Sequence, residues 1–156
     1  MNSILILDNI RSTHNVGAIF RTADAVGISM IYLVGYTPAP IDRFGKIRND
    51  IAKSALGAEQ TVPWKQVKNI GGLITSLKKK GYYIVALEQS PKSVSYTKVK
   101  KLAGKKPIAL IVGNEVDGVS EKTLAKCDLI AELPMHGMKE SLNVSVATGI
   151  MLYEIQ

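Results

Sequence analysis

Short apolar runs alternate with stretches of helical character along this chain, and this alternation restricts the possible folds more than any other feature. Five runs rich in Ile, Val, Leu and Tyr have the length of strands: residues 3–7, 30–34, 82–87, 107–112 and 129–133. Helical patterns lie between and after them, at residues 16–26, 47–56, 66–80, 120–126 and 142–155. Strands that are apolar throughout are typical of a sheet covered on both faces. The alternation therefore predicts an α/β fold, a parallel sheet flanked by helices and joined by right-handed crossovers.

The length of 156 residues is sufficient for one well-packed core, and we expect residues 1–156 to form a single domain. No apolar run approaches the roughly 18 residues of a membrane span, and residues 1–7 lack the features of a signal peptide. Cys127 is the only cysteine, so a disulfide framework is excluded, and a structural zinc site lacks enough ligands. We expect a cytoplasmic protein with no metal and no membrane partner.

The chain is basic, with a net charge of +7 from 20 Lys and Arg against 13 Asp and Glu. The cations gather in three groups, which are Arg43, Lys46, Arg48 and Lys53, then Lys78 to Lys80, then Lys98, Lys100, Lys101, Lys105 and Lys106. Such groups suit a polyanion, because phosphate contacts release counterions. The solvated surface of any basic protein has the same composition. Charge alone therefore does not distinguish a protein that binds nucleic acid from one whose solvated surface is simply basic.

Three polar, glycine-bearing loops follow predicted strands, at residues 8–17 (DNIRSTHNVG), 113–118 (GNEVDG) and 134–141 (PMHGMKES). Ligands of open parallel sheets bind outside the carboxyl ends of the strands, so these loops predict a ligand site. Each loop also has a structural interpretation: a capped helix start, an acidic turn, and Ser141 as the cap of the last helix. Residues 88–106 show no periodic pattern and are expected to form the longest irregular segment.

Several familiar site motifs are absent from the sequence. It contains no Gly-x-Gly-x-x-Gly dinucleotide fingerprint, no phosphate-binding GxxxxGK[ST] loop and no GxSxG nucleophile elbow. A dinucleotide-dependent enzyme, a P-loop nucleotidase and a Ser-His-Asp hydrolase are therefore poorly supported.

Three motifs together resemble a known family. They are NVGAIFR at residues 15–21, IVGNEVDG at 111–118 and LPMHGMKESLNVSVATG at 133–149. In this order and at these strand ends, they resemble the motifs of the SpoU (TrmH-like) branch of the SPOUT RNA methyltransferases. The stretches NVGAIFRTADAVG and SLNVSVATGIMLYE are most similar to the transfer-RNA guanosine 2′-O-methyltransferases of that branch. The resemblance extends over nearly the whole chain.

This resemblance implies an α/β domain with a C-terminal deep trefoil knot, S-adenosyl-L-methionine as cofactor, and methylation of a ribose 2′-hydroxyl in RNA. Transfer RNA is the favoured substrate and ribosomal RNA the next; a basic RNA-binding module without catalysis is the alternative from another class. The resemblance also implies a homodimer. The last helix would then bury an apolar stripe, formed by Leu142, Val146, Ile150 and Tyr153, against its partner. Alternatively, the same stripe packs on the sheet of its own chain.

The resemblance also assigns roles to individual residues. It places Leu87, Gly113, Leu133, Met135, Ser141 and Leu142 around the cofactor, with Gly113 allowing the backbone to approach it closely. The expected catalytic group is Arg21, Asn15, Glu115, Ser141 and Asn143. Ser141 and Asn143 would orient the ribose and the methionine end of the cofactor, while Asp117 would only form a turn.

Two roles are left open for some of these residues. Glu115 is expected to hold Asn15, Arg21 or the knotted loops, and Asn15 to hold Arg21 or a phosphate. In the family, Arg21 is the proposed general base, but a guanidinium stays protonated to above about pH 12. A bidentate clamp on the substrate phosphate is the alternative that we favour. A site shared between Arg21 of one subunit and the cofactor pocket of the other is expected.

Overall fold

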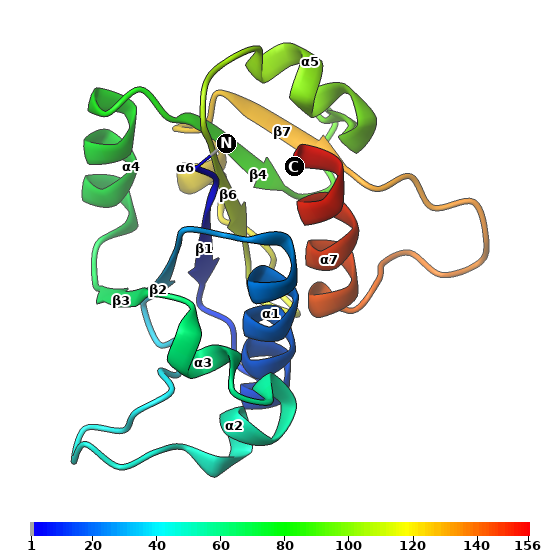
Figure 1. Cartoon of the computed structure of the whole chain (residues 1–156). Helices are drawn as coiled ribbons and strands as arrows, with labels where there is room; N and C mark the ends of the chain where they lie inside the picture. Colours follow the sequence, from blue (N-terminus) through cyan, green and yellow to red (C-terminus); the bar gives the residue numbers. More distant parts are fainter. Residues whose placement is uncertain (1) are drawn as a thin grey trace.

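A seven-stranded parallel sheet forms the centre of the computed structural model, which describes residues 2–156 (Figure 1). The strands are β1 (Ile4–Asp8), β2 (Met30–Val34), β3 (Trp64–Val67), β4 (Tyr83–Leu87), β5 (Val94–Ser95), β6 (Ile108–Val112) and β7 (Leu129–Glu132). Their order in the sheet is β3-β2-β1-β6-β4-β7-β5, and every pair of neighbours is parallel. The predicted α/β architecture with a parallel sheet is confirmed.

Helices cover both faces of this sheet. They are α1 (Thr13–Val26), α2 (Asn49–Ala55), α3 (Ala58–Thr61), α4 (Ile70–Lys79), α5 (Val99–Ala103), which the short 3-10 turn η1 (Tyr96–Lys98) precedes, α6 (Glu121–Leu124) and α7 (Val144–Ile155). In Figure 1, α1 and α7 lie on one side of the sheet, and α4 and α6 on the other. No helix within residues 2–156 is long and apolar enough to cross a membrane.

The two faces of the sheet carry separate hydrophobic clusters because successive strand residues point in opposite directions. Leu5 and Leu7 of β1 pack in the cluster that includes Phe20 of α1 and Met151 of α7. Ile6 packs in the other cluster, with side chains of α4 and α6. The central strands β1 and β6 are buried at every residue. This two-sided burial is the reason that their sequences are apolar throughout.

Both strands that the sequence did not predict lie at the edges of the sheet. Residues 66 and 67, expected to begin a helix, belong to β3, and α4 begins at Ile70 with Asn69 as its cap. In β3, Lys65 and Gln66 are exposed, so an apolar pattern is missing. The expectation of an irregular segment over residues 88–106 was wrong for its middle, which forms β5, η1 and α5. These elements are too short to give a periodic signal.

Helix α1 is held closely against α2 at Gly17. A Cβ atom at this position would lie 2.0 Å from Ser54 Oγ and 2.4 Å from the carbonyl oxygen of Ile51. The Ser54 hydroxyl donates a hydrogen bond to the carbonyl oxygen of His14, 3.0 Å away. The glycine of the NVGAIFR motif therefore serves helix packing, and it fixes α2 relative to α1.

Candidate active site

A cavity of about 590 Å³ opens at the carboxyl ends of β4, β6 and β7. We call it the main cavity; it is lined by Leu87 to Gln89, Val112 to Gly118, Glu132, Leu133, Met135, Glu140 to Val144 and Ala147. All six residues predicted to surround the cofactor are in its wall, and Glu115 and Asn143 join them. The fold therefore brings together three segments that are distant in sequence. The cavity lies where parallel sheets usually bind ligands.

The loop of residues 113–118 is closed on itself. The side-chain oxygen of the buried Asn114 accepts hydrogen bonds from the backbone N–H groups of Val116 (2.8 Å) and Asp117 (2.9 Å). Asp117 is exposed in this turn, in agreement with its predicted structural role. A Cβ atom at Gly113 would lie 2.5 Å from the carbonyl carbon of Gly118. Gly113 is thus required by the loop's own backbone, a reason different from the close cofactor approach that the resemblance implied.

Glu115 ties this loop to the start of α1. Its carboxylate accepts hydrogen bonds from the backbone N–H groups of Arg11 (2.9 Å) and Ser12 (3.0 Å) and from the side-chain amide of Asn15 (3.1 Å). Partial burial acts to raise the pKa of Glu115, but these hydrogen bonds outweigh it and hold the pKa below its ordinary value. Of the partners expected for Glu115, Asn15 is confirmed. A carboxylate that is occupied and ionised in this way is a poor general base.

Asn15 and Asn143 extend this connection to the last helix. The side-chain amide of Asn143 donates to Oδ1 of Asn15 at 3.2 Å, while Asn143 Oδ1 accepts from the backbone N–H of Ser145 at 2.9 Å. Asn143 is therefore the N-cap of α7, and the interpretation of Ser141 as that cap was wrong. Both polar atoms of the Asn15 amide are engaged, by Glu115 and Asn143.

Glu88 and Gln89 also hold the walls of the main cavity, and the sequence analysis missed them. Glu88 accepts hydrogen bonds from the backbone N–H groups of Val119 and Gln89, both at 2.9 Å. The Gln89 amide donates to the carbonyl oxygen of Glu140 at 2.6 Å, which connects the segment after β4 with the segment after β7. Their position directly after a predicted strand was the signal that could have identified them.

Arg21 does not line the main cavity. It lies on α1 in a second depression of about 470 Å³, which we call the Arg21 hollow. His14, Ala18, Thr22, Ala25, Lys53, Ser54, Leu56 and Tyr153 complete this hollow. Within a single chain, the structure thus separates Arg21 from the other predicted site residues.

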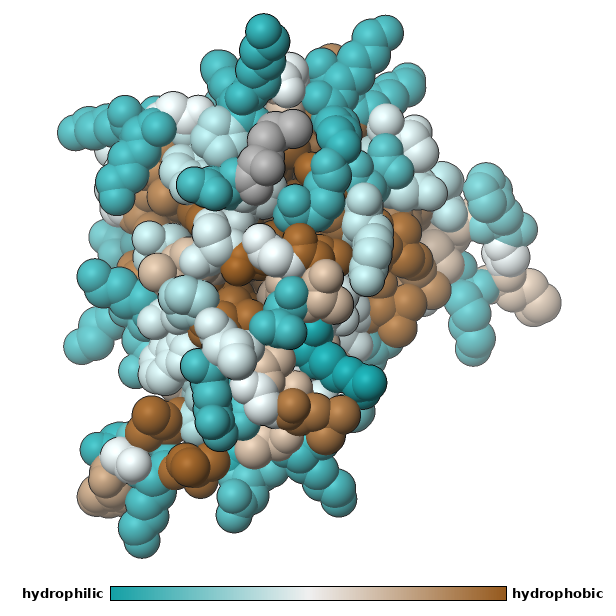
Figure 2. Space-filling model, viewed as in Figure 1, coloured by the Kyte–Doolittle hydropathy of each residue, from teal (hydrophilic) through white to brown (hydrophobic). Residues whose placement is uncertain are grey.

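The predicted apolar stripe at the C-terminus is exposed. Leu142, Val146, Ile150 and Tyr153 are 42%, 51%, 40% and 66% exposed, and the opposite face of α7 is the buried one. Figure 2 shows apolar residues gathered at the surface over α7. The alternative in which this C-terminal stripe packs on the chain's own sheet was therefore wrong.

The sequence of residues 2–153 matches the model of the SpoU rRNA Methylase family. The chain belongs to the SpoU family. A putative TrmH family tRNA/rRNA methyltransferase of Staphylococcus saprophyticus is 34% identical to this SpoU chain over 155 residues, covering 99% of the chain and 58% of the relative. The 23S rRNA (guanosine-2′-O-)-methyltransferase RlmB of Neisseria meningitidis is 37% identical over 152 residues, covering 97% and 56%. The SpoU chain thus spans slightly more than half the length of these relatives.

Solved structures of SpoU-family proteins have the same fold as this SpoU chain. The rRNA methyltransferase from Sinorhizobium meliloti, crystallised with AdoMet, superposes with a TM-score of 0.88 at 32% identity and covers 99% of this chain and 55% of that one. The A. aeolicus TrmH/SpoU tRNA modifying enzyme gives a TM-score of 0.84 at 37% identity, with 99% and 73% covered. The family and the fold class that the motifs predicted are confirmed.

Proposed function

We propose that this SpoU-family chain is an S-adenosylmethionine-dependent RNA methyltransferase that methylates a ribose 2′-hydroxyl. The observation that carries the proposal is the main cavity, whose wall joins all six predicted cofactor residues to Glu115 and Asn143. Its volume of about 590 Å³ suits a ligand of nucleoside size. The names of the Neisseria and Sinorhizobium relatives support a methyl-transfer reaction on RNA.

The charge of the main cavity fits this cofactor. Among the described residues, those that line the cavity include four glutamates and one aspartate but no lysine or arginine, in a chain of net charge +7. The sulfonium and amino groups of S-adenosylmethionine give it a net positive charge, which an acidic wall attracts. A nucleotide that carries several phosphates would be repelled. Leu87, Leu133 and Met135 supply apolar surface for the faces of an adenine ring.

The cofactor, when bound, would supply an electrophilic methyl group for the ribose oxygen, with the demethylated sulfide as leaving group and the hydroxyl proton released to bulk solvent. The chain must then position the alcohol and exclude water. We assign Arg21 to the substrate phosphate and the developing alkoxide, because a guanidinium is a planar cation that can form a bidentate contact with phosphate oxygens. Ser141 and Asn143 orient the ribose and the methionine end from the cavity wall. Glu115 and Asn15 position that wall through the hydrogen bonds described above.

A homodimer through the C-terminal stripe completes the proposed site. Leu142, at one end of the stripe, lines the main cavity, and Tyr153, at the other end, lines the Arg21 hollow. Pairing two chains through this stripe places both openings beside the interface. The separation of Arg21 from the cavity within one chain is the reason to propose a site shared between subunits. The solved relatives also support a C-terminal knot, which we include in the proposal together with a single domain over residues 1–156.

Transfer RNA is the first substrate that we propose and ribosomal RNA the second. The relatives' names include both, as the A. aeolicus and Neisseria proteins illustrate.

Calorimetry tests the proposal at the main cavity. S-adenosylmethionine and its demethylated product should bind the purified chain, whereas ATP and NAD should bind far more weakly. Leu133→Trp should block the cavity and abolish binding of both sulfur compounds. Folded wild-type protein that binds neither compound, with or without RNA, contradicts the proposal.

A further inference from the structure

Residues 35–48 connect β2 with α2 through a loop whose base packs on the core, where Thr37, Ala39 and Pro40 are buried, while none of residues 41–48 is buried. Its outer part forms a small hairpin: Ile41 pairs with Ile47 in an antiparallel bridge, and the backbone N–H of Asp42 donates to the carbonyl oxygen of Lys46 at 2.8 Å. We call residues 41–47 the hairpin. In Figure 1 the loop extends in cyan beyond the helices at the lower left.

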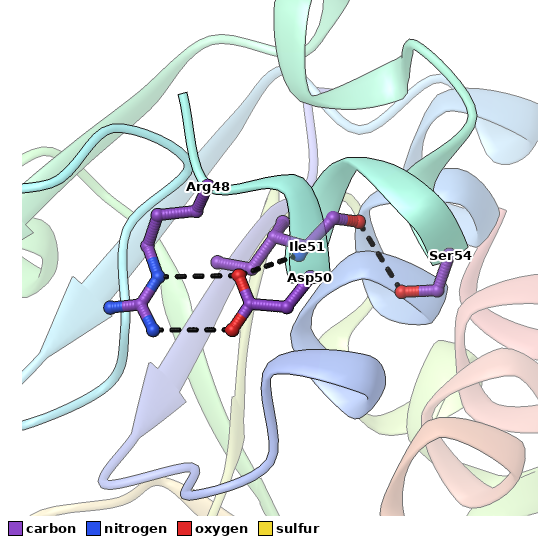
Figure 3. A network of polar contacts seen from close by, with 4 residues as sticks. All are labelled: Arg48, Asp50, Ile51 and Ser54. Carbon is purple, nitrogen blue, oxygen red and sulfur yellow. Dashed lines mark hydrogen bonds and ion pairs between the residues drawn. The ribbon is translucent and has the colours of Figure 1, made fainter. Parts of the chain in front are cut away.

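The hairpin is held in one conformation by local hydrogen bonds. Asp42 Oδ1 accepts from the backbone N–H groups of Phe44 (2.8 Å) and Lys46 (2.9 Å). At its base, the backbone N–H of Arg48 donates to the carbonyl oxygen of Pro40 at 2.9 Å. The Arg48 guanidinium contacts the Asp50 carboxylate at 3.2 Å, at the start of α2 (Figure 3). Asp42 is thus engaged in the turn, and Asp50 is engaged by Arg48.

The tip of the hairpin presents an aromatic ring beside unpaired cations. Phe44 is 73% exposed, and Cζ of Arg43 lies 4.8 Å from the centre of its ring. Within residues 2–156, neither Arg43 nor Lys46 forms a salt bridge. Figure 2 shows apolar residues interleaved with hydrophilic ones on this projection. An exposed ring flanked by cations matches the surfaces on which proteins stack unpaired bases.

The hairpin is rigidly connected to the Arg21 hollow. It leads directly into α2, which contributes Lys53 and Ser54 to that hollow. The close approach at Gly17 fixes α2 against α1, the helix that carries Arg21. Lys53 of α2 thus lies beside Arg21, and the hairpin with Arg43 and Lys46 precedes the same helix.

We propose that Phe44 stacks on an unpaired base of the RNA substrate, while Arg43 and Lys46 contact the phosphates beside it. This inference rests on the proposed function, and it specifies the substrate as an RNA with an unpaired nucleotide near the methylated one. The flanking cations favour RNA over an apolar protein partner, because a protein contact gains little from two unpaired charges at its centre.

The affinity of the 156-residue chain for two RNA probes tests this proposal. The probes are fluorescein-labelled bulk transfer RNA and a blunt-ended RNA duplex. Phe44→Ala and Phe44→Leu should weaken transfer-RNA binding by about tenfold or more, as loss of one stacked base predicts. Phe44→Trp should retain binding, because the indole stacks at least as well. The duplex should respond little to any of the three. Arg43→Gln and Lys46→Gln should each reduce the salt slope by about one.

Leu102→Ala is the matched control. Leu102 is another exposed apolar side chain, 50% exposed, in a lysine-rich segment. It lies on α5, at the opposite end of the sheet from the hairpin in Figure 1, and its truncation should leave RNA affinity unchanged.

The outcomes separate this inference from the proposed function. Wild-type protein that transfers no methyl group contradicts the proposed function, and RNA affinity still tests the hairpin. Wild-type affinity in Phe44→Ala overturns the hairpin proposal and leaves the proposed function intact. A changed molecular mass in Phe44→Ala with unchanged RNA affinity also overturns it, since the hairpin would then be a protein contact.

Discussion

The side-chain amide of Asn143 donates a hydrogen bond to Oδ1 of Asn15 across 3.2 Å, although the two residues are 128 positions apart. Because Asn15 in turn donates to Glu115, one chain of side-chain hydrogen bonds connects all three motifs. This series of hydrogen bonds links the start of α1, the loop after β6 and the start of α7. Its disruption should affect the shape of the main cavity more than the stability of the fold.

Replacing Asn143 distinguishes the effect on the main cavity from the effect on the stability of the fold. Asn143→Ala removes the α7 cap, and we expect it to lower the free energy of unfolding by about 0.5–2 kcal/mol. Asn69→Ala removes the corresponding cap of α4, where Asn69 Oδ1 accepts from the backbone N–H of Gly72, and should cost a similar amount. Only Asn143→Ala should also weaken S-adenosylmethionine binding, by about tenfold. Denaturant unfolding and calorimetry measure the two quantities. Equal cofactor affinity in the two variants would contradict the positioning role.

Buried Asp8 predicts a pH dependence of stability. Burial at the end of β1 raises the pKa of its carboxyl group above the ordinary 3.8. Protonated Asp8 therefore favours the folded state, and this contribution is present below pH 3.8 and is lost as the pH rises through the folded-state pKa. Asp8→Asn should raise the free energy of unfolding at neutral pH but give no gain in acid.

Glu115→Gln is the matched variant, and it should change the free energy of unfolding in the opposite direction to Asp8→Asn. The pKa of Glu115 is lowered in the folded state, so its stabilisation is present above pH 4.5 and is lost as the pH falls through the folded-state pKa. Glu115→Gln should therefore destabilise the protein at neutral pH and have less effect in acid. Urea unfolding as a function of pH measures both variants; parallel profiles would contradict the description of at least one of the two carboxylates.

Arg21 should act on substrate and transition state rather than on the cofactor. Arg21→Ala should fold and bind S-adenosylmethionine normally, yet lose about a hundred- to a thousandfold in the rate of methyl transfer. Arg21→Lys should recover little of this, because an ammonium group cannot form the bidentate contact. Single-turnover kinetics measure the loss. Retained activity in Arg21→Ala would remove Arg21 from the mechanism.

A charge on the C-terminal stripe should prevent dimerisation. Val146→Glu places a carboxylate at the centre of the proposed interface, and we expect it to convert a dimer into a monomer, as light scattering would report. Leu102→Glu introduces the same change at an exposed apolar position on α5 and should leave the mass unchanged. A monomeric wild-type protein, or a Val146→Glu protein that remains dimeric, argues against pairing through this stripe.

The buried parts of the fold could be predicted from the sequence, because burial on both faces leaves long apolar runs. Residues 30–34 were predicted to the residue, and the other central strands to within one residue at each end. Edge strand β3 was not predicted, because its exposed residues Lys65 and Gln66 interrupt such an apolar run. The start of α7 was placed two residues early, since Asn143 was not recognised as its cap.

The candidate site shows a similar division. Family motifs were sufficient to predict several side chains that line the main cavity, because the order of the motifs along the chain determines which strand ends they follow. The contacts among them depend on packing in three dimensions. The hydrogen bonds of Glu88 and Gln89 therefore appeared only in the structure. The position of Arg21 outside the cavity of its own chain had been expected, because the resemblance implied a site shared between subunits.

Methyl transfer itself tests the central claim most directly. Purified protein is incubated with S-adenosylmethionine labelled on the methyl group and with fractionated cellular RNA, and the RNA is digested to nucleosides and separated by chromatography. We predict label in a single 2′-O-methylated nucleoside, and none when a chemically synthesised substrate carries a 2′-deoxyribose at that position. Label on a base, or no label in any RNA fraction while the folded protein binds the cofactor, would contradict the account.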